Sequence, residues 1–163
     1  MPALPAEAAW WFLPFVTPIC LWVAWSDMAH MKIRNLAVAA LTAVYLLIGP
    51  IALPFDVWAW NWVHLIVVLV VGFAITVVGG MGAGDAKFAA AAAPFFMLRD
   101  LSLAFYLLTA ITLAALVTHR TARALPAVRR LAPGWESWAR RDFPMGLALG
   151  GTLLAYLGLA ALS

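Results

Sequence analysis

The sequence predicts an all-α integral membrane protein, built as a bundle of about six transmembrane helices with the N-terminus and the C-terminus outside. Two observations predict this class. Of the 163 residues, 66% are hydrophobic and only 10% are charged, which is unlike the composition of a soluble domain. The apolar residues also form runs close to the roughly 20 residues that a helix needs to cross a bilayer. We expect a single transmembrane domain over residues 1–163.

Six apolar segments are the predicted spans. Their lengths favour helices, because only helices and closed barrels satisfy backbone hydrogen bonds in lipid. The fourth segment is short, and either begins inside a glycine run or inserts only in part. No Lys or Arg precedes Lys32, so we expect the first span to be retained rather than cleaved as a signal peptide. The predicted spans are 8–26, 36–53, 62–79, 86–98, 101–118 and 143–162.

The basic residues predict the orientation of the bundle. With the N-terminus outside, nine of the ten Lys and Arg residues fall on the cytoplasmic side and only Arg99 lies outside, as the positive-inside rule requires. The tryptophan-rich segment 55–62 is then an external connector in the aromatic belt. Segment 119–142 becomes an arginine-rich cytoplasmic loop, with His119 as a loop residue. We expect this loop to anchor the topology and to contact anionic lipid heads.

Two acids beside apolar spans, Asp27 and Asp85, are the candidates for chemistry, because such acids are energetically expensive. The chain crosses the membrane twice between them, so both lie on the same, cytoplasmic side. Asp85 follows four glycines in six positions, Gly79, Gly80, Gly82 and Gly84. The position of Asp85 at the start of a predicted helix can be explained by helix capping. Capping does not explain the glycines, which permit unusual backbone angles and the close approach of a substrate backbone.

The two acids suggest an aspartyl dyad. Asp27 ends its span, where the helix dipole disfavours an anion, whereas a helix N-terminus should lower the pKa of Asp85. One carboxylate could activate water while its protonated partner polarises a scissile carbonyl, and either acid fits either role. The competing interpretation of Asp27 is an interfacial acid paired with Lys32 or Arg34.

Other reactive residues form no recognisable site. Asp27 and His30 have a spacing that could hold a metal, but no matching His or Cys cluster stands nearby, so we expect no metal and no cofactor. The single cysteine, Cys20, excludes a disulfide framework. Lys87 either stabilises the charge of the acids or, more simply, extends to the interface. Gly146 and Gly150 have the spacing of close helix packing.

Three segments resemble type IV prepilin leader peptidases, which are membrane aspartic proteases. Gly82-Ala83-Gly84-Asp85-Ala86-Lys87 resembles their GxGDxK motif. Asp27 with Ile33-Arg34-Asn35 resembles their first aspartate segment, with Arg34 where proline is usual. Phe143-Pro144-Met145-Gly146-Leu147-Ala148 resembles their late Pro-Tyr-Gly segment. The resemblance implies that Asp27 and Asp85 are catalytic. It implies that the residues that shape the site or bind substrate are Gly82, Gly84, Lys87, Asn35, Pro144 and Gly146.

The resemblance also implies a function, the removal of a short basic leader from prepilins at the cytoplasmic face of a bacterial inner membrane. Larger members carry a cysteine-bearing insert and methylate the new N-terminus. This chain lacks the insert, so we expect no methyl transfer and no S-adenosylmethionine site. The small size resembles members that serve Flp-type pili. The expected partners are the prepilin, the lipid bilayer and the pilus assembly machinery, without nucleic acid. Glu136 and Asp142 are candidate contacts for the leader.

Other functions stay open at this point. The same chemistry could act on preflagellin or on signal peptides. A small proton-coupled transporter would use Asp27 and Asp85 as proton carriers and would cleave nothing. A pilus-assembly membrane subunit would not need either acid. Leader cleavage that depends on both acids separates the peptidase from the other two classes.

Overall fold

The structure is a computed structural model that describes all 163 residues, and it is entirely helical, with no strand. Seven α-helices are joined by short turns and by three 3₁₀ turns. Their bounds are α1 (Ala6–His30), α2 (Asn35–Ala52), α3 (Phe55–Val77), α4 (Ala83–Ala92), η1 (Ala93–Phe95), η2 (Leu98–Asp100), α5 (Leu101–Ala124), α6 (Pro126–Leu131), η3 (Glu136–Trp138) and α7 (Met145–Ala161).

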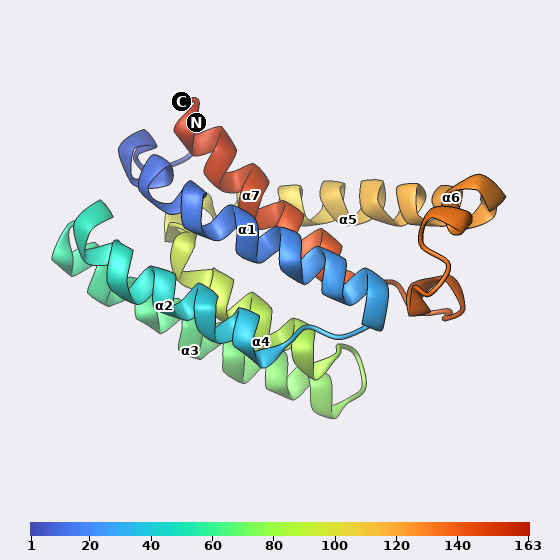
Figure 1. The fold of residues 1–163 in the computed structure, drawn as a ribbon. Coiled ribbons are helices and arrows are strands. Elements are labelled where there is room, and N and C mark those ends of the chain that lie inside the picture. Colours follow the sequence, from blue (N-terminus) through green and yellow to red (C-terminus); the bar gives the residue numbers. More distant parts are fainter.

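Helices α1 and α7 form the centre of the bundle and run antiparallel (Figure 1). Helix α2 packs on α1, α5 packs on α7, and α3 packs on α4. Both termini lie at one end of this bundle, where α1 begins and α7 ends (Figure 1). The opposite end carries the turns between α1 and α2 and between α3 and α4, together with the segment that leads into α7.

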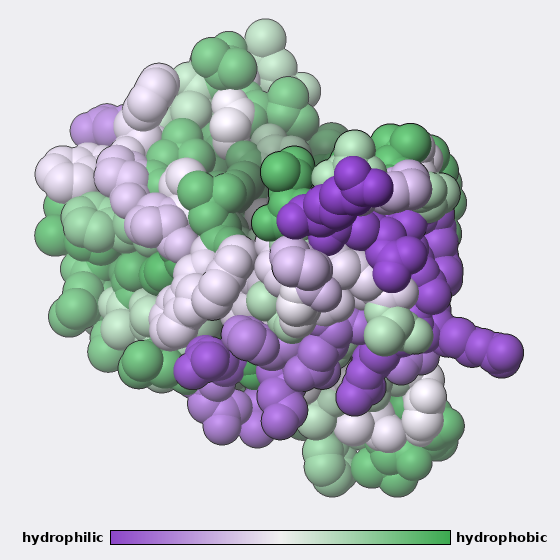
Figure 2. All heavy atoms as spheres, turned by 45° about the vertical axis from the view of Figure 1, so that its right-hand side comes forward, coloured by the Kyte–Doolittle hydropathy of each residue, from purple (hydrophilic) through white to green (hydrophobic).

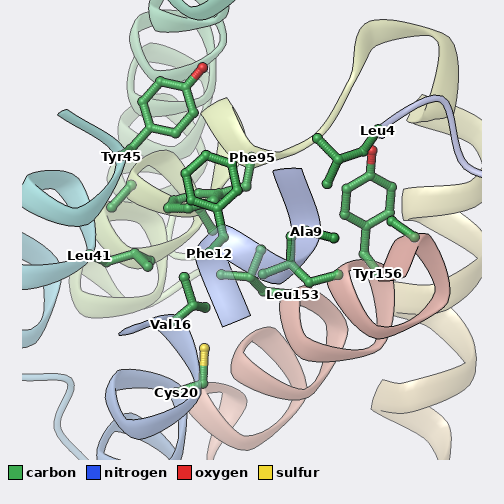
Figure 3. Packing of buried hydrophobic residues seen from close by; sticks show 14 of the residues in the cluster. Leu4, Ala9, Phe12, Val16, Cys20, Leu41, Tyr45, Phe95, Leu153 and Tyr156 are labelled. Carbon is green, nitrogen blue, oxygen red and sulfur yellow. The ribbon is translucent and has the colours of Figure 1, made fainter. Parts of the chain in front are cut away.

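The core between these helices is apolar and aromatic (Figure 3). The rings of Phe12 and Phe95 meet edge to face with centroids 4.9 Å apart, and Tyr45 meets Phe95 in the same way at 5.1 Å. Such edge-to-face pairs are the favoured geometry for aromatic side chains. The cluster ties the turn after α4 to α1 and α2, and so fixes the depth of α4 in the bundle.

The prediction of a helical membrane protein is confirmed, since four helices are long and apolar enough to cross a membrane. They are α1, α2, α3 and the continuous segment Leu98–Ala124. Helix α7 is apolar but has 17 residues, and α4 has only 10. The predicted fourth span, 86–98, therefore differs from the structure. Its helix begins within the glycine run at Ala83, and it ends at Ala92 because Pro94 cannot donate the next helical hydrogen bond.

The prediction that segment 55–62 is a connector is wrong, because this segment is the first part of α3. Helix α2 instead ends just before Pro54, where Leu53 takes the extended conformation that precedes proline. Tyr45 and Trp58 hold this tight turn through two side-chain hydrogen bonds. The Tyr45 hydroxyl donates to the Trp58 carbonyl at 3.3 Å, and Trp58 Nε1 donates to the Tyr45 carbonyl at 3.2 Å.

The prediction that segment 119–142 is a loop, with His119 as a loop residue, is wrong for its first part. Helix α5 continues to Ala124, so His119 is a buried helical residue, and its ring stacks on Trp138 at 5.4 Å. Arg120 and Arg123 donate to backbone carbonyls of Arg141 and Arg140 at 3.0 and 2.7 Å. Two of the six arginines therefore bind backbone within the segment itself, in addition to any contact that the basic side chains make with lipid heads.

A buried carboxylate ties the terminal end of the bundle together. Asp100 accepts hydrogen bonds from the Tyr156 hydroxyl and from the Ala3 backbone N–H, both at 2.7 Å, and is 6% exposed. Removing the carboxylate in Asp100→Ala leaves the buried Tyr156 hydroxyl and the Ala3 N–H without this acceptor. We expect a loss of about 1–3 kcal/mol in the free energy of unfolding. Thermal unfolding in detergent measures it, and an unchanged midpoint would show that the network does not stabilise the fold.

Candidate functional site

The end of the bundle opposite the termini contains a cleft of about 710 Å³. Figure 2 shows hydrophilic side chains gathered over this end, whereas the flanks are mainly hydrophobic. Both predicted acids, Asp27 and Asp85, line the cleft, although they are far apart in the sequence. The other lining residues come from three segments, Met31, Lys32, Ile33, the run 79–84, and Arg140, Asp142, Phe143 and Met145.

Asp27 belongs to the last turn of α1, and its side chain is 5% exposed. The backbone N–H of Gly146, at the start of α7, donates to Asp27 Oδ2 at 2.6 Å. Helix α1 is followed by Met31, which has a left-handed backbone with φ of +50°, and the Met31 N–H donates to the Asp27 carbonyl. The buried Ser26 hydroxyl donates to the Lys32 carbonyl at 2.9 Å and fixes the turn that follows. The carboxyl of Asp27 is therefore held by α7 and directed towards the cleft.

Asp85 lies in the first turn of α4, outside the four long spans. Burial raises the pKa of its carboxyl from the ordinary value of 3.8 to about 6. The negative charge of Asp27 acts in the same direction, and the hydrogen-bonding backbone of Gly82 opposes both. The expectation that the helix N-terminus would lower this pKa is therefore wrong. Desolvation and the like charge of Asp27 raise the pKa at this position.

Gly146 is required by close contacts, and Gly82 and Gly84 also lie against side chains of the site. A Cβ atom on Gly146 would lie 2.9 Å from Asp27 Cβ, and one on Gly82 would lie 2.7 Å from Asp85 Oδ2. Gly84 packs against Ile33, where a Cβ would lie 3.4 Å away. Gly79 has φ of +77°, a conformation that other residues rarely adopt. Gly146 and Gly82 thus bring backbone close to Asp27 and Asp85.

The remaining predicted site residues lie around the cleft rather than in its lining. Lys87 Nζ donates to Asn35 Oδ1 at 3.4 Å on the exposed surface beside it. Pro144 is buried and precedes the first residue of α7, which places the Gly146 N–H on Asp27. Arg34 occupies the position before α2 with φ of −75°, which is close to the value that proline would impose. The turn therefore keeps a proline-like shape without proline.

Several lining residues were not predicted from the sequence. Met31, Met81, Phe143 and Met145 give the cleft an apolar part, and no periodic pattern marks them. Of the two candidate leader contacts, Asp142 lines the cleft, whereas Glu136 begins the turn η3 and does not. Asp142, Phe143 and Met145 adjoin Pro144, which was a predicted site residue, so this part of the lining could have been predicted from its position in the sequence.

The arrangement suits hydrolysis by a pair of carboxyl groups. Asp85 changes charge near pH 6, so it can act as an acid or a base in the range where cells operate. Asp27 is positioned by a backbone donor, and both groups face one open cleft. The structure brings no group of three His, Cys, Asp or Glu side chains together for a metal.

The raised pKa of Asp85 predicts a pH-dependent stability. The folded state holds the proton more tightly than the unfolded chain. The stabilising contribution is therefore complete below about pH 4 and is lost as the pH rises through about 6. Asp85→Asn should raise the free energy of unfolding at pH 7.5, and with it the thermal midpoint. The gain is on the order of 1 kcal/mol, because the group is partly exposed. The gain should vanish at pH 4.

A matched background isolates the contribution of the second acid. In Asp27→Asn, the like charge is absent, so Asp85→Asn should give a smaller gain at pH 7.5. Thermal unfolding in detergent at both pH values measures all four proteins. A fall in the midpoint of Asp85→Asn at pH 7.5 would contradict the raised pKa.

Comparison with known proteins bears on this site. The model of the type IV leader peptidase family matches residues 15–118, more than half of the chain. The matched region contains both acids and the glycine run, and it ends before α7. No curated protein and no solved structure matches the chain.

Proposed function

Since the chain belongs to the type IV leader peptidase family, we propose that it is an aspartic endopeptidase that removes the basic leader from prepilins without N-methylation. The observation that carries this proposal is the shared cleft, which two carboxyl groups from α1 and α4 line at one end of a multi-pass membrane protein. The proposed location is the bacterial inner membrane, with the cleft facing the cytoplasm. The cluster of basic residues at this end supports that orientation.

Hydrolysis follows from two carboxyls that share one proton. The ionised group takes a proton from water, and the water oxygen attacks the carbonyl carbon of the scissile peptide bond. The protonated group donates to the carbonyl oxygen, which gives a tetrahedral diol. The C–N bond then breaks as the group that took the proton from water passes it to the leaving nitrogen. The other group takes a proton from one hydroxyl of the diol, so the dyad again holds one proton. Asp27 and Asp85 are the two groups, and Gly146 holds the first in place.

The short connection between α1 and α2 supports the absence of methyl transfer. Only Met31–Arg34 separates these helices, which leaves no room for a cysteine-bearing insert at this position. The same feature supports an Flp-type prepilin as the substrate, because the small members of the family that lack the insert serve such pili. Asp142 in the cleft gives a basic leader one acidic contact, and its neighbour Arg140 lies 3.9 Å away.

Co-expression with an Flp-type prepilin tests the proposal. Mass spectrometry of the pilin should show a new N-terminus at the leader junction, with no added methyl group. A methylated product would contradict the proposed absence of N-methylation. Absence of cleavage, with a prepilin that another leader peptidase processes, would favour the transporter or assembly-subunit alternative.

A further inference from the structure

A second hollow lies along the flank of the bundle, within its apolar part. It is a groove of about 390 Å³ between α3 and α5, with α4, residues 93–98 and α7 as its floor. Helix α3 packs mainly on α4, and α5 packs mainly on α7, so the surface where α4 meets α7 is flanked by these two helices. Val67 of α3 and Phe105 of α5 stand on opposite walls and are 53% and 60% exposed.

Helix α4 connects this groove to the acid-lined cleft. Asp85 lines the cleft, while Ala89 and Ala92 line the groove. These positions are four and seven residues apart and therefore lie on one face of the helix. Seven residues of α-helix rise about 10 Å, so the groove begins within that distance of Asp85.

Helix α7, like α4, lines both the cleft and the groove. Met145 lines the cleft, while Leu149 and Thr152 line the groove, again at positions four and seven residues further along. Two separate helices thus present a single face to both hollows. The cleft and the groove therefore follow one another along the shared faces of α4 and α7, and we call the two hollows together the furrow.

We propose that the groove holds the apolar helix that follows the scissile bond of a membrane-inserted substrate. This inference rests on the proposed peptidase function and adds a docking surface to it. The floor is built partly of alanine side chains, which let another helix approach closely in a membrane. A substrate helix must be continuous with the peptide bond that is cut, and the shared faces of α4 and α7 lead from the groove to the acid-lined cleft. A lipid chain or a second copy of the protein would not require this connection.

The furrow also predicts the register of the substrate. An extended peptide rises about 3.3 Å per residue, so about three residues span the roughly 10 Å between Asp85 and the floor of the groove. The substrate helix should therefore enter the groove from about the third residue after the cut. Residues before the cut should lie in the polar cleft.

Photo-crosslinking tests the occupant directly. A benzophenone amino acid replaces Phe105, which lines the groove, or its neighbour Tyr106, which is 75% exposed and does not line it. Both are placed in the Asp85→Asn protein, co-expressed with the Flp-type prepilin. We expect at least tenfold more crosslinked prepilin from position 105, at residues after the leader junction. Crosslinks from position 105 to lipid alone or to a second copy would overturn the proposal, as would equal yields from both positions.

A steric variant tests the same surface in the active enzyme. Ala104→Trp on α5 fills the groove, whereas Ala110→Trp places the same side chain on an exposed part of that helix outside the groove. We expect Ala104→Trp to raise KM at least tenfold for the full prepilin and to change it less than twofold for a peptide without the apolar helix. Equal KM values for the two variants would overturn the docking role.

The two levels of the proposal fail differently. If the wild-type protein does not cleave the prepilin, the peptidase function falls and the docking surface falls with it. If the wild type cleaves while neither crosslinking nor KM distinguishes the paired positions, only the docking surface is overturned.

Discussion

Replacing either Asp27 or Asp85 with asparagine should lower the rate of leader cleavage by on the order of 10³-fold. The amide has nearly the shape of the carboxyl, but it can neither take a proton from water nor pass one to the carbonyl oxygen. Both acids line one cleft, and the proposed mechanism uses both in the same step. The double variant should therefore be no slower than the single variants, because residues that act as a unit are not additive. Initial rates of cleavage of purified prepilin in detergent measure these effects.

The matched control is Asp56→Asn, which makes the same chemical change at an exposed acid in the first turn of α3. It should cleave at the wild-type rate. Size-exclusion profiles and thermal midpoints establish that all the variants are folded. Cleavage that persists in the folded Asp27→Asn and Asp85→Asn proteins would exclude the dyad as the catalytic device.

The second large effect is expected for Gly146→Ala. Its new Cβ atom would lie 2.9 Å from Asp27 Cβ, 3.0 Å from Asp27 Oδ2 and 3.1 Å from Val23 Cγ1, all of which are tightly buried. Alanine keeps the backbone N–H, so any loss of activity comes from displacement of the carboxyl rather than from loss of the donor. We expect cleavage to fall tenfold or more. Overpacking of this kind also costs about 1–3 kcal/mol of folding free energy.

Gly158→Ala provides the control within the same helix. A Cβ atom there would have no neighbour within 4 Å, and alanine is the better helix former by about 1 kcal/mol. Gly158→Ala should therefore keep full activity and unfold at the same or a higher temperature. If Gly146→Ala cleaves as fast as Gly158→Ala, the contact between α7 and Asp27 is not needed for catalysis.

The main elements of the fold were predictable because hydrophobic runs are a strong local signal. The limits of the runs were less predictable, for identifiable reasons. Helix α3 extends across 55–62 because nothing in that segment breaks a helix, and tryptophan at an interface looks the same in a helix as in a connector. Helix α5 extends past His119 because Trp138 and the backbone of 140–141 return to cover it. These are tertiary contacts between residues far apart in the sequence, and no local sequence pattern predicts them.

The candidate site shows the same division. The placement of Asp27 and Asp85 at one end followed from counting crossings, and the structure brings both into one cleft. The pKa of Asp85 was predicted in the wrong direction, because the dipole can be read from its position in the helix whereas burial cannot. The left-handed turn at Met31 was also hidden, because no glycine marks it.

The bond between Asp27 and Gly146 has a consequence for biogenesis. Its two partners are 119 positions apart, and they belong to the helices that pack together most extensively. At a synthesis rate of about 5–20 residues per second, the amide that holds the carboxyl is made about 6 to 24 seconds after it. A nascent chain halted before α7 carries both acids but not the group that orients the first. The proposed site is therefore complete only after α7 has been made, so proteolysis should begin after the synthesis of the last helix rather than during that of the earlier ones.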